Sequence, residues 1–187
     1  MLIETLVLAL IIAYVQGGRL TNLKDIPFNW MGLALLAFGL QFLINLNSSF
    51  LLNPYFSKQV LHNVSYLFLF LFLLRNYSLP GLKCICVGVL LNFLVITLNG
   101  GAMPVDPSML PEQHRQLLAL GQGGTHGLLT AQTHLALLAD RIYIYLPLLR
   151  GQLFSIGDIF IDVGSFYLIY FNMKLSKNYR VRTVYMR

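Results

Sequence analysis

Five apolar runs, each long enough or nearly long enough to cross a lipid bilayer, dominate the hydropathy pattern of the chain. A transmembrane helix needs roughly 20 mainly apolar residues. The runs cover Leu2–Val15, Trp30–Leu46, Tyr55–Leu74, Leu82–Leu98 and Leu153–Met173. Charged residues make up 11% of the 187 residues, whereas a soluble domain carries about 25%. The sequence therefore predicts an all-α fold, a polytopic membrane helical bundle of about five transmembrane helices.

One long connection, residues 99–152, separates the fourth run from the fifth. Pro111–Leu120 begins with a proline and is followed by a glycine, which is typical of a helix. Thr125–Ala139 is a second predicted helix, and Tyr143–Leu149 is too short to cross and is expected at the membrane interface. We therefore expect a transmembrane domain over residues 1–173, with a partly helical outer connection, and a basic tail over residues 174–187.

Basic residues are distributed unevenly between the two faces that five spans would create. Nine Lys and Arg residues fall on the face that carries the C-terminal tail, and four fall on the other face. Because the more basic face of a membrane protein is usually cytoplasmic, the N-terminus and the long connection are predicted to lie outside. The tail is expected to contact anionic lipid head groups. A nucleic-acid partner is not expected, since no groove-reading motif accompanies the charge.

Polar side chains recur in the half of each apolar run that is predicted to be outermost. Such groups are costly in hydrocarbon and usually face the bundle interior or water. We therefore expect them to meet in one polar ligand-binding pocket in the outer half of the bilayer. The candidates are Gln41 and Asn45 in the second run, Asn92 and Asn99 in the fourth, and Asp158 and Asp162 in the fifth.

The two aspartates of the fifth run are open to two interpretations. Asp158 follows Ser155 closely enough to cap the start of a helix. Asp162 lies a turn deeper, where a carboxylate must be wetted, protonated or paired. The alternative is that both aspartates form a cation or substrate site, or an ion pair with Arg141 or Arg150.

Signatures of catalysis and metal binding are absent from the sequence. The four histidines contain no His-x-x-x-His spacing, and there is no nucleophile elbow, phosphate loop or dinucleotide fingerprint. Cys84 and Cys86 are two residues apart in an apolar run, where a helix would point them apart. We therefore predict no catalytic residue, no metal and no cofactor.

Four short stretches together resemble a known family. They are Gly18-Arg19-Leu20, Asn99-Gly100-Gly101-Ala102-Met103-Pro104, His134–Asp140 and Ser155-Ile156-Gly157-Asp158. In this order they resemble a family of small bacterial membrane proteins that is known as a numbered domain of unknown function (five-three-one-seven). The third stretch has Ala139 where the family pattern leads us to expect glycine, but it keeps Asp140. The resemblance implies a bacterial source and an integral membrane fold, and no particular activity. We expect a bacterial plasma-membrane protein, and we also count His134 and Asp140 among the ligand-binding candidates.

Three functions fit these observations. The first is a non-enzymatic membrane protein, either a subunit of a complex or homo-oligomer or a binder of a small ligand or lipid. The second is a proton- or cation-coupled transporter that uses Asp158 and Asp162. The third is an enzyme that acts on a lipid-linked substrate, with Asp140, Asp158 or His134 as acid and base. The absence of catalytic signatures favours the first.

Overall fold

Five apolar helices form most of the structure, a computed structural model that describes residues 2–45, 58–120, 123–146 and 149–175. The chain is mostly helical, as predicted. The fourth predicted run and the first coincide with helices, whereas the fifth helix starts three residues later than predicted because the preceding residues form a strand. The apolar helices are α1 (Leu2–Val15), α2 (Met31–Asn45), α3 (Lys58–Arg75), α4 (Leu82–Leu98) and α6 (Ile156–Lys174).

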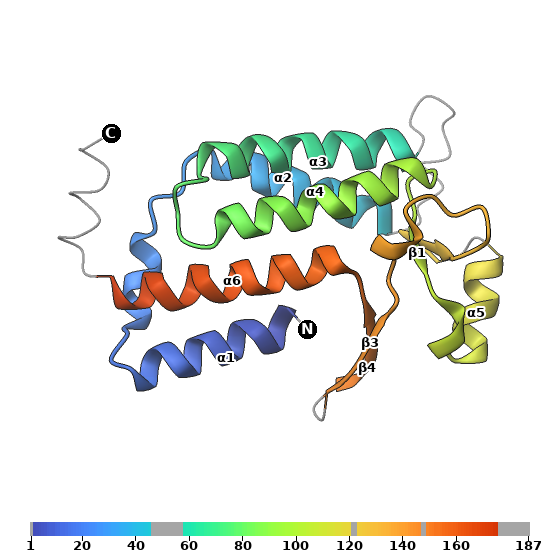
Figure 1. Ribbon diagram of the computed structural model, residues 1–187. Coiled ribbons are helices and arrows are strands. Elements are labelled where there is room, and N and C mark those ends of the chain that lie inside the picture. The colour runs from blue at the N-terminus through green and yellow to red at the C-terminus, as the bar shows by residue number, and fades with distance from the viewer. Residues whose placement is uncertain (1, 46–57, 121–122, 147–148, 176–187) are drawn as a thin grey trace.

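The apolar helices lie side by side in one bundle (Figure 1). Helix α6 packs against α1 and α4, and α3 packs against α2 and α4. At one end of the bundle, a short helix η1 (Leu20–Asp25) joins α1 to α2. At that end, two hydrogen bonds join the residue two before α2 to the residue after α3. The backbone N–H of Asn29 donates to Oδ1 of Asn76, and the Asn76 side-chain amide donates to the carbonyl of Asn29, both over 2.8 Å.

Glycines allow α4 and α6 to approach closely. A methyl group added at Gly88 would lie 2.4 Å from the carbonyl oxygen of Gly157, and one at Gly164 would lie 2.6 Å from that of Gly81. No side chain fits at such distances. The two glycine pairs are seven residues apart on both helices, so they follow one stripe along the contact. Close approach through small residues is common between helices in membranes.

The connection between α4 and α6 covers the other end of the bundle (Figure 1). It contains the helix predicted over Pro111–Leu120, which is present as α5 (Glu112–Ala119). The connection also contains two sheets of two strands each. Strand β1 (Met103–Val105) pairs in parallel with β2 (His126–Leu128), and β3 (Ile142–Leu146) pairs antiparallel with β4 (Leu149–Phe154). The short helices η3 (Pro107–Met109) and η4 (Ala136–Leu138) complete it.

The helix predicted over Thr125–Ala139 is wrong. This segment contains β2, turns and η4 instead. Threonine side chains replace helical hydrogen bonds here, because the N–H of Thr130 donates to the hydroxyl of Thr133 over 2.9 Å. Such local bonds compete with a helix. Of the segment expected at the interface, Tyr143–Leu149, the described residues belong to strands β3 and β4.

Helix length alone does not show five membrane spans. Among the described helices, α6 is long and apolar enough to cross a membrane, and the other four apolar helices have 10–17 residues within their apolar parts. At about 1.5 Å per residue, 14 residues in α1 give roughly 21 Å, less than the roughly 30 Å of a hydrocarbon core.

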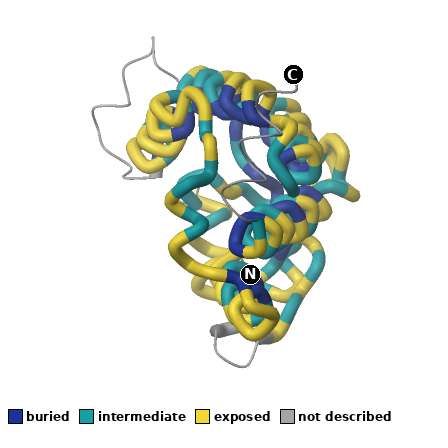
Figure 2. The backbone as a smooth tube through the Cα atoms, turned by 90° about the vertical axis from the view of Figure 1, so that its left-hand side faces the viewer, coloured by how far each residue is buried: buried dark blue, intermediate teal, exposed yellow. Residues whose placement is uncertain are grey.

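Buried residues line the inward sides of the helices, and exposed ones cover their outward sides (Figure 2). The largest buried cluster joins α2, α3, α4 and β1, with Ala37, Leu73, Val95 and Met103 among its members. The chain thus ties the start of the connection into the same core as the helices, which fixes the connection over one end of the bundle.

Candidate functional site

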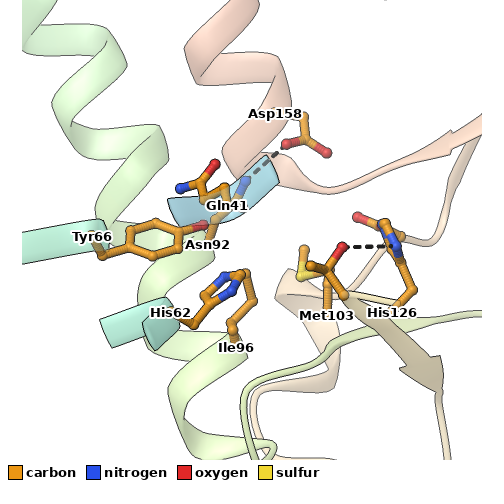
Figure 3. A pocket seen from close by; sticks show the side chains of 10 residues that line it. Gln41, His62, Tyr66, Asn92, Ile96, Met103, His126 and Asp158 are labelled. Carbon is orange, nitrogen blue, oxygen red and sulfur yellow. Dashed lines mark hydrogen bonds and ion pairs between the residues drawn. The ribbon is translucent and has the colours of Figure 1, made fainter. Parts of the chain in front are cut away.

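A polar cavity of about 180 Å³ lies where the connection meets the helix bundle (Figure 3). Three apolar helices, the start of α6 and the connection contribute to its lining. The lining residues are Gln41, His62, Tyr66, Asn92, Ile96, Met103, Thr125, His126, Asp140 and Asp158. Polar side chains therefore meet at one end of the bundle from segments far apart in the sequence.

A hydrogen-bonded network forms the side of the cavity between α4 and α6. The amide of Asn92 donates to Oδ1 of Asp158 over 2.8 Å, and the hydroxyl of Ser155 donates to Oδ1 of Asn92 over 3.0 Å. Asp158 also accepts from the backbone N–H of Ser155, while the N–H of Asp158 donates to the Ser155 hydroxyl. This reciprocal pair is a capping box. The predicted capping role of Asp158 is therefore confirmed, and the same carboxylate faces the cavity.

His62 and Tyr66, one turn apart on α3, form a second side. Their rings lie 5.1 Å apart between centroids, and Tyr66 extends from α3 across the cavity toward Asn92 (Figure 3). His62 is 4% exposed, and neither of its ring nitrogens has a hydrogen-bond partner within the residues that the structure describes. A buried polar group without a partner costs roughly 1–3 kcal/mol. The fold thus keeps an imidazole at this cavity at a cost in stability.

Strand β1 positions the two titratable residues, His126 and Asp140, that the connection contributes to the described cavity lining. Met103 is paired with His126 of β2, and Val105 forms a parallel bridge with Asp140 on its other edge. The N–H of Asp140 donates to the carbonyl of Pro104 over 2.9 Å. Positive φ values at Gly100 (72°) and Gly101 (86°) turn the chain from α4 into β1. The glycine turn and β1 therefore hold His126 and Asp140 over the cavity.

Asp140 is a carboxyl group in an unusual environment. It is 6% exposed, and its Oδ1 accepts no hydrogen bond from any described residue. Its Oδ2 lies 3.8 Å from Nε2 of His126, which is too far for a hydrogen bond. Burial raises the pKa of Asp140 to about 7, and the nearby charge of Asp158 adds to the shift.

No lysine or arginine side chain that the structure describes lines the cavity. Arg141 follows Asp140 directly in the sequence but pairs with Asp106, since its Nε lies 3.6 Å from Oδ2 of Asp106. The predicted ion pair of Arg141 with Asp158 or Asp162 is therefore wrong. For Arg150, the other suggested partner, the side chain lies outside the described residues.

Four of the eight candidate ligand-binding residues line this cavity together. They are Gln41, Asn92, Asp140 and Asp158. Gln41 also donates to the hydroxyl of Ser65 over 3.4 Å, which orients its amide on α2. The structure thus brings together polar residues of the second, fourth and fifth apolar runs with one residue of the connection.

The other four candidates lie elsewhere. The side chain of Asn99 makes two hydrogen bonds to the backbone of His134. The Asn99 amide donates to the His134 carbonyl, and the His134 N–H donates to Oδ1 of Asn99, both over 2.9 Å. Asn99 lines a separate hollow of about 160 Å³ on the connection. Asp162 is buried on α6, with Thr5 and Glu4 of α1 as neighbours. The side chain of Asn45 lies outside the described residues.

Six residues of the lining were not among the eight ligand-binding candidates. They are His62, Tyr66, Ile96, Met103, Thr125 and His126. His62 stands at the same end of its apolar run as the other polar candidates, so its depth was a usable signal. His126 was misplaced by the wrong helix, because only strand pairing with β1 brings it over the cavity.

The cavity suits binding better than metal coordination. Within the described part of the chain, no three His, Cys, Asp or Glu side chains are placed to hold a metal ion. The lining instead offers hydrogen-bond acceptors from two carboxylates, amides and imidazoles. Such a set can hold a small molecule with N–H or O–H groups, or transfer a proton.

Comparisons with known proteins agree with the resemblance seen in the sequence. A family model described as "Family of unknown function (DUF5317)" matches residues 25–170. An uncharacterized protein of Thermotoga maritima is 34% identical over 176 residues, which cover 93% of this chain and 92% of the relative. No solved structure matches the chain. The chain belongs to the DUF5317 family.

Proposed function

We propose that this protein is an integral membrane protein that binds a small polar ligand in the cavity beneath the connection, without catalysing a reaction. The proposal rests on two buried groups of the cavity lining. The ring nitrogens of His62, one of which is an acceptor in a neutral imidazole, and the acceptor Oδ1 of Asp140 lack partners among the residues described. Buried polar groups are normally hydrogen-bonded. A ligand that donates hydrogen bonds would satisfy both.

The outward faces of all five apolar helices support a membrane location. Large apolar side chains are exposed on each helix at intervals of three or four residues, as on one face of a helix. Such patches are unusual on soluble monomers. They are Ile3, Val7 and Ile11; Leu35, Phe38 and Phe42; Leu67, Leu71 and Leu74; Val87, Leu90 and Leu94; and Phe160, Val163 and Tyr167. All five helices are proposed to cross the membrane, with a thinned or adapted bilayer around the shortest.

Aromatic and basic side chains at the end opposite the cavity support an orientation. Arg75 lies 5.8 Å from the ring centroid of Trp30, and Lys174 lies 5.0 Å from that of Tyr170. Aromatic residues favour membrane interfaces and basic ones the cytoplasmic side. This end and the C-terminal tail are therefore proposed to face the cytoplasm of a bacterium, near anionic lipid head groups, with the N-terminus and the cavity outside.

A series of probes with similar size and different charge tests ligand binding. Ethanolamine, ethylene glycol and glycolate are added to the purified protein in detergent, and thermal unfolding is followed. At least one probe should stabilise the protein, by about 2.7 kcal/mol at a hundredfold excess over its Kd. The variant Thr125→Trp, which places an indole in the cavity, should lose this effect. No stabilisation by any of the three probes would contradict the proposal.

A further inference from the structure

The cavity presents acceptors on several sides, and its described lining carries no lysine or arginine. Asp140 enters from the connection, Asp158 from α6 and His62 from α3. Apart from Tyr66, the other titratable residue in the lining is His126 of β2. An anionic ligand would meet two carboxylates, without a lysine or arginine in the described lining to balance them. A cationic ligand would meet complementary charge.

We propose that the ligand carries a primary ammonium group, which the cavity binds between Asp140, Asp158 and His62. This inference rests on the proposed ligand-binding function and specifies the class of ligand. An ammonium group has three N–H donors and no acceptor. It therefore matches the open acceptor positions at Asp140, Asp158 and His62.

The partners of each residue leave acceptor capacity for such a group. Oδ1 of Asp140 accepts nothing from the described residues. The two oxygens of Asp158 each accept one bond, from Asn92 and from Ser155, so each keeps a lone pair. A neutral imidazole at His62 supplies one ring nitrogen as an acceptor. The ring of Tyr66 gives the cation an aromatic wall.

Protons should compete with the ammonium ligand at Asp140. Burial and the charge of Asp158 raise the pKa of Asp140 to about 7, so its carboxylate form predominates above pH 7 and is lost below it. His126, 3.8 Å away on β2, His62 and Tyr66 on α3, and Asp158 on α6 are the other titratable groups around it. Ligand affinity should therefore fall as the pH drops through 7.

Calorimetric titration of the protein in phosphatidylcholine nanodiscs tests this inference. Ethanolamine, which stays protonated across the range, should bind about tenfold more weakly at pH 6 than at pH 8, because the ionised fraction of a group with pKa 7 falls about tenfold. Ethylene glycol should bind at least tenfold more weakly than ethanolamine at pH 8. Asp140→Asn should weaken ethanolamine binding at pH 8 and remove its pH dependence.

Asp106→Asn is the matched control on the same connection. The hydroxyl and backbone N–H of Ser108 hold the pKa of Asp106 below its usual value, and this residue does not line the cavity. The control should bind ethanolamine like the parent protein at both pH values.

The same measurement separates failure of this inference from failure of the proposed function. If ethylene glycol or glycolate binds as well as or better than ethanolamine, the ammonium inference is overturned while ligand binding stands. If ethanolamine shows no binding, the ammonium inference is overturned regardless of the other probes. Nanodiscs that contain phosphatidylethanolamine identify the source of the ammonium group: block of ethanolamine binding supports a lipid head group, and unchanged binding supports a free amine.

Discussion

Replacing Gly88 by alanine is expected to lower the free energy of unfolding by about 3 kcal/mol. The added methyl group would lie 2.4 Å from the carbonyl oxygen of Gly157 and 2.9 Å from the backbone nitrogen of Ile161. These atoms belong to the backbone of α6 and cannot rotate away, so α4 and α6 must separate. Titration with SDS in mixed micelles, followed by circular dichroism, measures the change.

Gly39→Ala on α2 is the matched control for this substitution. No described atom lies within 4 Å of a methyl group at Gly39, so the gain in helix propensity of roughly 0.5–1 kcal/mol should remain. The two glycine-to-alanine changes should thus shift stability in opposite directions. Equal effects at Gly39 and Gly88 would show that α4 and α6 do not depend on glycine contacts.

Replacing His62 by phenylalanine is expected to raise the free energy of unfolding by about 1–3 kcal/mol. The substitution removes two ring nitrogens that have no partner in the described structure and keeps a ring against Tyr66, 5.1 Å away between centroids. The same change should abolish stabilisation by the ligand probe. A gain in stability with loss of binding is typical of a residue retained for function.

His114→Phe serves as the control for the histidine change. His114 is exposed on α5, and surface substitutions usually change stability by no more than about 0.5 kcal/mol. If His62→Phe lowered stability by more than the control, His62 would have a structural partner and would not be held as an open acceptor.

The apolar pattern predicted the helices well because hydrophobic runs bounded by glycine and polar residues determine where they begin and end. Leu82–Leu98 was predicted with the bounds it has in the structure. Its end is visible in the sequence, since Asn99-Gly100-Gly101 permits the positive φ values found there. The lengths of these helices, however, do not by themselves establish five membrane spans.

Half of the eight predicted ligand-binding residues line the cavity. The position of a residue along a helix can be read from the sequence, whereas strand pairing within the connection cannot. Gln41, Asn92 and Asp158 share a level in the bundle, and the structure brings them to one cavity. Asp162 lies one turn further along α6, where it faces α1 instead. His126 reaches the cavity through parallel pairing of β2 with β1, which no local sequence pattern indicates.

The accessibility of position 62 tests most directly whether a polar cavity enters the membrane bundle from outside. With Cys84 and Cys86 replaced by alanine, His62→Cys and Leu69→Cys are compared in spheroplasts, using a cationic methanethiosulfonate reagent that does not cross membranes. Both positions are buried on α3, with 4% exposure at His62 and 9% at Leu69. We expect that His62→Cys reacts from outside and that Leu69→Cys does not. Equal, negligible labelling at both positions, from either side of the membrane, would contradict this expectation.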